Sequence, residues 1–326
     1  MQTNLKKIIR YLSDGQFHSG AGLGKRLGMT RSGVWKYIGQ FPELDIEIEA
    51  AHAKGYRIPQ GLSLLKLPAI KKHVSKHTLS LLKKIILLDI IDSTNDYLLQ
   101  LARKNTDNIY ICLAEQQIAS KARHGRSWLS PFAANILLSV LWPFRQDVSS
   151  LSGLSLSVAT IVVEVLEELG IKNDLGLKWP NDILWQGKKL AGILVEIIAE
   201  SHDICNVIIG VGFNVNMPTK FAKKIDRPWI DLATITNKFC DRNKIAGLLI
   251  DQLIIGLNKF ETVGFAGFAD KWQQYDVLLN KKVRVILFDK VIKGTMRGID
   301  KNGYLLLEDR TGKLQTFSAG EVSIGF

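Results

Sequence analysis

Residues 19–41, SGAGLGKRLGMTRSGVWKYIGQF, decide the architecture of the N-terminal part of this chain. Ser19 and Thr30 each stand where a side-chain oxygen can cap a helix, and Gly28-Met29 between them makes a tight turn. Apolar residues recur at helical spacing through the stretch, at Leu23, Leu27, Val34, Ile38 and Phe41. Two helices joined by a short glycine-containing turn form the helix-turn-helix pattern.

The flanking residues extend this unit on both sides. A preceding helix is predicted from the spacing of Leu5, Ile8, Ile9 and Leu12, and it ends at Asp14-Gly15. After residue 41, apolar and polar positions alternate on both sides of a Lys54-Gly55 turn, at Ile46, Ile48, Tyr56 and Ile58. Residues 1–62 are therefore predicted to be a winged helix-turn-helix domain.

The charge distribution suggests what this domain binds. The whole chain has a net charge of +12. Residues 1–62 hold nine lysines and arginines against five acidic residues, and residues 63–84 hold six lysines and no acidic residue. A basic front end on a nearly neutral body indicates contact with a polyanion, although a solvated basic surface gives the same count. In this motif the third helix enters the major groove, so the expected DNA-binding residues are Arg31, Ser32, Lys36 and Tyr37 of that helix and Lys54 and Arg57 of the wing.

The rest of the chain divides into three predicted parts. Residues 63–84 form a basic linker. In residues 85–275, strands are predicted at Ile136–Trp142, Leu190–Ile198 and Val207–Val215, with long helices at Leu151–Leu169 and Ala246–Phe260. Strands and helices do not alternate strictly, which indicates an α+β fold with a mixed or antiparallel sheet. Residues 276–326 alternate apolar and polar positions between turns, which predicts a small barrel or sandwich.

Several classes of protein and site are disfavoured. No uninterrupted apolar run approaches the ~20 residues of a membrane helix, and the charged N-terminus does not read as a secretory signal. The three cysteines, Cys112, Cys205 and Cys240, are scattered, which suits a reduced cytoplasm. The chain has no GxxxxGK[ST] phosphate loop and no Gly-x-Ser-x-Gly elbow. No residues have metal-ligand spacing, so no resident metal is expected.

Five short strings in the central part carry candidate chemistry. They are Ser-Thr-Asn at 93–95, Ser-Lys-Ala-Arg-His-Gly-Arg at 120–126, Lys-Trp-Pro-Asn-Asp at 178–182, Lys-Leu-Ala-Gly-Ile-Leu-Val-Glu at 189–196 and Gly-Val-Gly-Phe-Asn-Val-Asn at 210–216. Each alone has an ordinary structural explanation, such as a solvated basic loop or glycines that permit packing. Lysines and arginines that converge on a polar pocket would suit charge stabilisation in acyl or phosphoryl transfer.

Taken together, these strings resemble the biotin–protein ligases that double as repressors of the biotin operon. The resemblance covers nearly the whole chain, and it includes Glu115 with Gln117 and the paired strings at 178–182 and 189–194. It implies a winged helix-turn-helix, a central domain like that of class II synthetases, and an SH3-like C-terminal barrel. It also implies a cytoplasmic enzyme that joins biotin to Mg-ATP as biotinyl-5′-adenylate. The acceptor would be a lysine of the biotin carboxyl carrier protein of acetyl-CoA carboxylase. The implied further partners are operator DNA and, with adenylate bound, a second copy of the chain; no membrane is expected.

The resemblance also implies roles for individual residues. The expected catalytic residues are Lys189, Arg123, Lys178 and Asp182. The expected biotin-binding residues are Ser93, Thr94, Asn95, Gln117, Lys121, Ala122, Arg123, Lys189 and Gly192. Asn214, Trp229 and Lys121 are expected to bind ATP or the adenylate.

One loop departs from the family pattern, which is Gly-Arg-Gly-Arg-Arg-Gly-Arg where this chain has residues 120–126. Ser120 and Ala122 replace glycines. If those positions need a positive φ, the replacements strain the loop and loosen the grip on the adenylate; a differently shaped loop of equal grip is the alternative. Two rival functions also remain, a biotin-sensing repressor with weak or no ligase activity and a lipoate or other acyl ligase.

Overall fold

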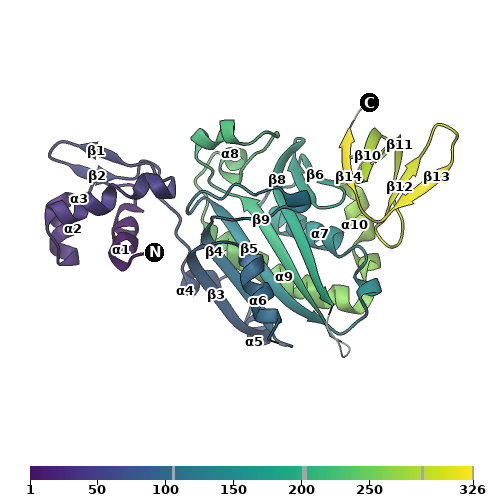
Figure 1. The fold of residues 1–326 in the computed structure, drawn as a ribbon, viewed down its shortest axis with the longest axis horizontal. Coiled ribbons are helices and arrows are strands. Elements are labelled where there is room, and N and C mark those ends of the chain that lie inside the picture. Colours follow the sequence, from purple (N-terminus) through teal and green to yellow (C-terminus); the bar gives the residue numbers. More distant parts are fainter. Residues whose placement is uncertain (105–106, 200–203, 288–289, 325–326) are drawn as a thin grey trace.

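The computed structural model describes residues 1–104, 107–199, 204–287 and 290–324. It has three parts that follow the order of the sequence (Figure 1). A small helical head lies at one end, a central α+β domain lies in the middle, and a small β domain lies at the other end (Figure 1).

The head has the three helices that the sequence predicts. These are α1 (Thr3–Leu12), α2 (Gly20–Leu27) and α3 (Arg31–Ile38). The Ser19 Oγ accepts a hydrogen bond from Gly22 N at 3.0 Å, and the Thr30 Oγ1 accepts one from Gly33 N at 3.1 Å, so both predicted caps are present. Phe41 is buried with Val34 and Ile38, but it lies in a short 3₁₀ turn after α3 rather than on the helix itself.

The wing is a two-stranded antiparallel ribbon, β1 (Glu49–Ala51) and β2 (Gly55–Arg57). It begins later than the alternation predicted, because Ile46 packs into the core of the head instead of forming a strand. Gly55 has φ +101°, and a Cβ there would lie 2.1 Å from the carbonyl oxygen of His18. The wing therefore folds back onto the start of α2 at a position that only glycine fits.

Residues 63–84, predicted to be a linker, are largely part of the central domain. They contain α4 (Leu67–Lys71), α5 (Lys76–Leu81) and the start of β3. Both helices contact α9, and Ile70 and Val74 belong to the main hydrophobic core. The lysines of this segment lie beside apolar residues at helical spacing, and those apolar residues hold the segment against the domain.

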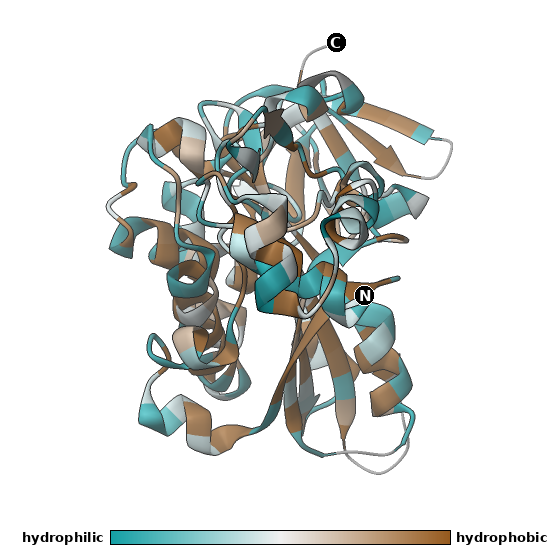
Figure 2. Ribbon diagram, turned by 90° about the vertical axis from the view of Figure 1, so that its left-hand side faces the viewer, coloured by the Kyte–Doolittle hydropathy of each residue, from teal (hydrophilic) through white to brown (hydrophobic). Residues whose placement is uncertain are grey.

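The central domain is built on a seven-stranded mixed sheet. Its strands are β3 (Leu82–Ile91), β4 (Ile109–Gln117), β5 (Asn135–Phe144), β6 (Leu175–Lys178), β7 (Asp182–Trp185), β8 (Lys188–Ala199) and β9 (Cys205–Asn214). Their order is β3-β4-β5-β9-β8-β7-β6, and β3 runs parallel to β4 while every other neighbouring pair is antiparallel. The middle strands are hydrophobic along most of their length (Figure 2).

The two faces of this sheet have different coverings. Helices α7 (Leu154–Glu168) and α9 (Arg242–Val263) pack together in the main core with Val207, Ile209 and Val211 of β9. On the other face, α6 (Thr94–Ala102) packs on Ile208 of the same strand. Two shorter helices, α8 (Leu232–Thr236) and α10 (Ala269–Gln274), complete the domain. Since α6 is short, it leaves part of its face of the sheet open.

The segment Val148–Glu168 is long and apolar enough to cross a membrane by length and composition. The sequence did not reveal it as an uninterrupted apolar run, because serine, threonine and glutamate occur among its apolar residues. Most of α7 is buried, and the helix contacts α9, α10 and β8. We therefore assign it as the core helix of a folded domain.

The C-terminal domain is all β, as the sequence predicts. Its five antiparallel strands are β10 (Lys282–Leu287), β11 (Lys290–Ile299), β12 (Leu305–Glu308), β13 (Leu314–Phe317) and β14 (Glu321–Ile324). They are ordered β13-β12-β11-β10-β14. The buried Trp179 donates a hydrogen bond from Nε1 to the carbonyl oxygen of Gly303 at 3.1 Å, which joins this domain to the central one.

Candidate functional site

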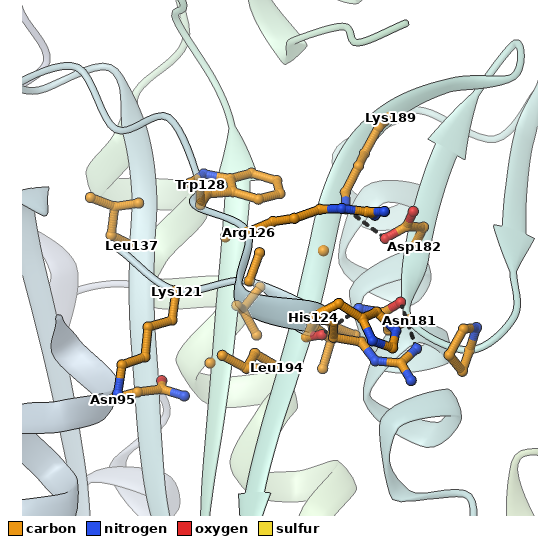
Figure 3. Close-up of a pocket in the computed structure, with 18 of the residues that line it drawn as sticks. Asn95, Lys121, His124, Arg126, Trp128, Leu137, Asn181, Asp182, Lys189 and Leu194 are labelled. Carbon is orange, nitrogen blue, oxygen red and sulfur yellow. Dashed lines mark hydrogen bonds and ion pairs between the residues drawn. The ribbon is translucent and has the colours of Figure 1, made fainter. Parts of the chain in front are cut away.

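The open part of the central sheet forms the floor of a pocket (Figure 3). Three glycines lie on this floor, Gly192 on β8 and Gly210 and Gly212 on β9. A Cβ on Gly210 would lie 2.5 Å from Asn95 Oδ1, and a Cβ on Gly212 would lie 2.8 Å from the Trp128 ring. Side chains from α6 and from the loop above the sheet therefore pack directly on the backbone of these strands.

One end of the pocket holds a polar cluster built mainly from hydroxyl and amide groups. Thr94 N and Oγ1 both donate to Gln117 Oε1, at 2.6 and 2.9 Å. The Ser139 Oγ donates to Asn95 Oδ1 at 2.5 Å, and Asn95 Nδ2 donates to Glu196 Oε2 at 2.6 Å. Because these donors and acceptors are buried or half buried and hold one another, they are oriented before any ligand arrives.

The other end of the pocket gathers cations. Lys189 Nζ lies 2.6 Å from Asp182 Oδ1 and 5.3 Å from the centre of the Trp128 ring (Figure 3). Lys178 stands opposite Asp182 in the β6–β7 pairing, and burial lowers the pKa of its ammonium while Asp182 opposes that shift. Burial likewise lowers the pKa of the Arg123 guanidinium, which donates to Asn181 Oδ1 at 3.5 Å.

The loop above the sheet carries further cations, and the side chain of Lys121 points to the polar end of the pocket beside Asn95 (Figure 3). Lys121 forms an ion pair with Asp96, and the hydrogen bond between them raises the pKa of the lysine. Arg126 donates to both oxygens of Glu321, each at 2.8 Å, and Arg227 Nη2 lies 3.6 Å from Glu321 Oε1. These hydrogen bonds lower the pKa of Glu321. The carboxylate of the C-terminal domain thus holds arginines from two loops at the pocket mouth.

The strain expected in residues 120–126 is absent at the two substituted positions. Ala122 has φ −132° and ψ 175°, an extended conformation that any residue adopts. Ser120 is not among the described residues with positive φ; its Oγ accepts a hydrogen bond from Trp128 N at 3.0 Å and donates one to Trp128 O. The left-handed residues are His124 and Gly125. The expectation of strain at Ser120 and Ala122 was wrong, because the left-handed turn lies two residues later and Ser120 fastens the loop to Trp128.

Eleven of the residues expected from sequence line this one pocket. They are Ser93, Thr94, Asn95, Gln117, Lys121, Ala122, Arg123, Lys178, Asp182, Lys189 and Gly192. Asn214 and Trp229 do not line it. The Asn214 amide donates to the carbonyl oxygens of Ile230 and Lys189 at 3.1 and 3.4 Å, and Trp229 pairs with Lys189 as a β-bridge. In this conformation both hold the segment beside Lys189.

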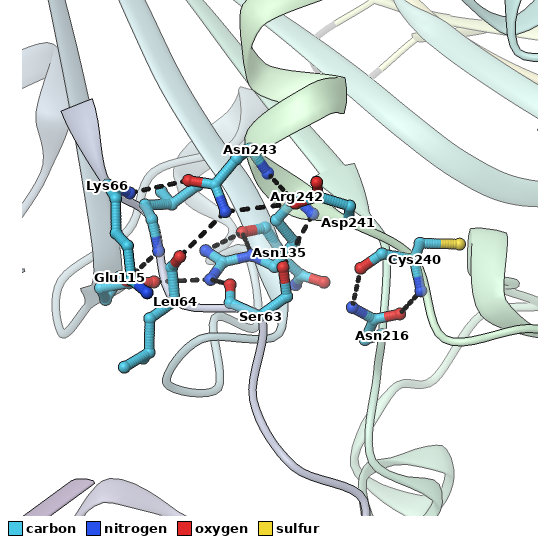
Figure 4. A network of polar contacts seen from close by, with 11 residues as sticks. Ser63, Leu64, Lys66, Glu115, Asn135, Asn216, Cys240, Asp241, Arg242 and Asn243 are labelled. Carbon is cyan, nitrogen blue, oxygen red and sulfur yellow. Dashed lines mark hydrogen bonds and ion pairs between the residues drawn. The ribbon is translucent and has the colours of Figure 1, made fainter. Parts of the chain in front are cut away.

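Glu115, part of the sequence signature, lies outside this pocket in a separate buried network (Figure 4). Its Oε2 accepts from Arg242 Nη1 at 2.6 Å, and its Oε1 accepts from Leu65 N at 2.7 Å. Arg242, which is fully buried, also donates to the carbonyl oxygens of Ser63 and Asn135. This network fastens the chain that leaves the head to β4, β5 and α9. Sequence reasoning missed Arg242 because its partner is 127 positions away.

The candidate DNA-binding face of the head differs from expectation at two residues. Arg31, Ser32, Lys36 and Lys54 are exposed, but Tyr37 is half buried against the core of the head. Trp35, which the sequence analysis omitted, is 66% exposed. A helical wheel would have found it, because position 35 lies one turn after Arg31. Arg57 is held over Phe17 at 4.6 Å and paired with Glu49 at 2.7 Å, so it is less available to DNA than predicted.

Comparison with known proteins gives consistent matches along the chain. A family model described as "HTH domain" matches residues 4–57, one described as "Biotin/lipoate A/B protein ligase family" matches residues 87–214, and one described as "Biotin protein ligase C terminal domain" matches residues 278–325. No group of three or more histidine, cysteine or acidic side chains placed to hold a metal occurs among the described residues.

Similar proteins match over nearly their whole length. The "Bifunctional ligase/repressor BirA" of Escherichia coli is 37% identical over 98% of this chain and 96% of that protein. The protein of the same name from Bacillus subtilis is 30% identical over the full length of both. Among solved structures, the biotin protein ligase from Aquifex aeolicus in complex with biotin and ATP is 29% identical, with a TM-score of 0.63, over 74% of this chain and 99% of that one.

Proposed function

This chain belongs to the family of bifunctional biotin ligases and repressors, and from that membership we propose that it activates biotin with ATP, transfers it to a protein lysine and represses transcription. The observation that carries the catalytic part is that Arg123, Lys178 and Lys189 gather with Asp182 at one end of the pocket, while hydroxyl and amide groups predominate at the other. Biotin has an uncharged bicyclic ring and a carboxylate at the end of its side chain. Such a pocket fits that ligand, with the ring at the polar cluster and the carboxylate toward the lysines and arginines.

The first half-reaction joins two anions. The carboxylate oxygen of biotin attacks the α-phosphorus of Mg-ATP, the bond to the β,γ-diphosphate breaks, and pyrophosphate leaves with the electron pair. The reactants repel each other until cations neutralise them, and we assign this role to Lys121, Arg123 and Lys189. Asn181 and Asp182 orient Arg123 and Lys189 before the charge develops, whereas the Lys121 ammonium is paired with Asp96 at the polar end. Mg²⁺ enters with ATP as part of the substrate, since magnesium is commonly held by nucleotide phosphates and few carboxylates.

The second half-reaction needs an uncharged amine. The acceptor ammonium first loses a proton to solvent, and the neutral amine then attacks the carbonyl carbon of biotinyl-5′-adenylate. The amide bond forms, the acyl C–O bond breaks, AMP leaves with the electron pair, and the second proton passes to solvent. Lys178 and Asp182 stand together at the mouth on β6 and β7. We assign to Asp182 the positioning of the incoming ammonium and to Lys178 the neutralisation of the leaving AMP. The acceptor we propose is the biotin carboxyl carrier protein of acetyl-CoA carboxylase, and the reaction runs in the cytoplasm, where ATP and operator DNA are available.

Repression requires that ligand binding in the pocket change the DNA-binding head. The polypeptide that carries Lys121, Arg123 and Trp128 continues directly to Phe132 and Ala133, which pack in the hydrophobic cluster of the head. Lys6 of α1 also forms an ion pair with Asp89 of β3. We propose that adenylate binding favours a homodimer whose two heads bind a two-fold related operator, because a ligand shifts an equilibrium only toward the state that it binds better. Sedimentation with and without biotin and ATP tests this step, and a monomer that persists at saturating adenylate would disprove it.

A matched pair of variants tests the catalytic assignment. Transfer of labelled biotin from ATP and biotin to a carrier domain is measured for the Lys189→Ala and Lys188→Ala chains. Lys188 is exposed, adjoins Lys189 on β8 and lies outside the pocket, so its loss controls for charge and fold. We expect Lys189→Ala to slow adenylate formation roughly a hundredfold, the scale of one lost charge-stabilising donor, and Lys188→Ala to remain near the wild type. Equal rates for the two variants would contradict the assignment, and no transfer by the wild type with biotin would favour a sensor or another acyl ligase.

A further inference from the structure

The recognition helix presents one large apolar side chain to solvent. Trp35 is 66% exposed. Among the described residues of the head, Met1 is the only other exposed large hydrophobic residue, at 38%. The opposite side of α3 is buried through Val34 and Ile38. Trp35 is therefore not needed for the core of the head, and its indole ring remains available to a partner.

The surroundings of Trp35 identify the chemistry of that partner. Arg31 lies one helical turn before it, Lys36 follows it, and Ser32 shares the exposed surface. No acidic residue occurs in α3. An aromatic ring between two cations suits a ligand that has negative charges at its surface and apolar groups between them. The capped N-terminus of the helix also favours negative charge. Duplex DNA has this character in its major groove, whereas an apolar protein surface would leave the cations without partners.

Within the major groove, one base offers an apolar group to such a ring. Thymine presents its C5-methyl group there, and the other three bases present only hydrogen-bond donors and acceptors. We propose that Trp35 is a specificity-determining residue that contacts the methyl group of one thymine in each half-site. The rise from Arg31 to Trp35 is about 6 Å, and one base step is about 3.4 Å, so this thymine lies within about two steps of the base that Arg31 contacts. The inference rests on the proposed DNA binding and adds the base and the atom that are read.

Replacement of thymine by uracil tests the contact, because uracil lacks only the methyl group. The full chain, with biotin and ATP, first selects its preferred duplex from a random pool. Each thymine of the selected site is then replaced singly by uracil, and the dissociation constant is measured at fixed salt. We expect one position per half-site where uracil weakens binding about fourfold, the factor that burial of one methyl group supplies. At that position 5-methylcytosine, whose methyl group occupies the same place, should bind better than cytosine.

Two variants separate the methyl contact from electrostatic attraction between the helix and the DNA phosphates. The Trp35→Ala chain should bind the thymine and uracil duplexes equally. The Lys36→Ala chain should bind both more weakly, with a smaller salt dependence, while the thymine-to-uracil ratio stays near four. Since both side chains are exposed, circular dichroism melting should show both variants folded.

The outcomes distinguish this inference from the proposed function. A selected duplex in which no uracil replacement matters would overturn the role of Trp35 and leave DNA binding intact. A uracil effect of the same size in Trp35→Ala would assign the methyl contact to another residue. Failure of the wild-type chain to select any duplex would overturn both the DNA-binding function and the contact.

Discussion

Replacement of Gly210 by alanine should damage biotin binding through the polar cluster behind it. Gly210 lies on β9 with ordinary backbone angles, so alanine costs nothing in backbone strain. Its new methyl carbon, however, would lie 2.5 Å from Asn95 Oδ1 and 3.1 Å from Asn95 Cγ. Ordinary contacts begin near 3.4 Å, so the Asn95 amide must move by about 0.9 Å. Asn95 is 4% exposed and tied to Ser139 and Glu196, so it can move only toward the pocket and only by giving up these hydrogen bonds.

The expected magnitude follows from that geometry. The 2.5 Å hydrogen bond from Ser139 to Asn95 would lengthen to the limit of a hydrogen bond, and a buried polar group left without its partner costs about 1–3 kcal/mol. Overpacking a well-packed site costs a similar amount. If the substitution destabilises the biotin-binding conformation of the pocket by about 2–3 kcal/mol, the dissociation constant for biotin rises about 30- to 150-fold.

Titration calorimetry with biotin, without ATP, measures this change. The control is the same substitution in an Asn95→Ala chain, where the obstructing amide is gone and Gly210→Ala should cost less than about threefold. Thermal unfolding of each chain shows whether the fold survives. A dissociation constant for Gly210→Ala within threefold of the wild type, or an equal loss in both backgrounds, would show that the amide is mobile and that the argument from packing fails.

Three further substitutions have distinct expected outcomes. Glu321→Gln should loosen Arg126 and speed the release of biotinyl-adenylate severalfold in a pulse-chase experiment, since a neutral amide cannot hold a guanidinium as a carboxylate does; an unchanged release rate would mean that the C-terminal domain does not hold the loop. Burial raises the pKa of Asp276 to about 6 from an ordinary 3.8, because it disfavours the charged carboxylate. The stability of the folded state that comes from the neutral carboxyl is therefore fully present below pH 3.8 and is lost as the pH rises through 6. Asp276→Asn should therefore raise the free energy of unfolding at pH 8 by about 1 kcal/mol, after allowance for its partial exposure, and should flatten its dependence on pH between 4 and 7; an unaltered pH profile in urea unfolding would contradict this. Arg242→Met should lower the free energy of unfolding by about 3–5 kcal/mol because it leaves a buried carboxylate unpaired, and a loss below 1 kcal/mol would show that solvent reaches that carboxylate.

Local patterns in the sequence determined the elements of this protein. The caps at Ser19 and Thr30 and the apolar spacing between them predicted two helices of the head, because capping and helical periodicity depend on residues at most four positions apart. Strands β5, β8 and β9 were predicted from runs of apolar residues, which are also local patterns in the sequence. Lys178 and Asp182, which belong to one short string of the sequence, pair across the turn between β6 and β7 because they are only four positions apart.

Tertiary structure alone decided which distant residues meet and which faces are exposed. Arg242 finds Glu115, and Glu321 finds Arg126, across 127 and 195 positions, and no local pattern encodes such a distance. The conformation of residues 120–126 was also beyond the sequence, since a serine in place of glycine reads as strain until its partner Trp128 is known. The same holds for Tyr37, which the core of the head half buries. Local geometry is set by neighbours in the chain, whereas burial, pairing and charge are set by the neighbours that the completed fold supplies.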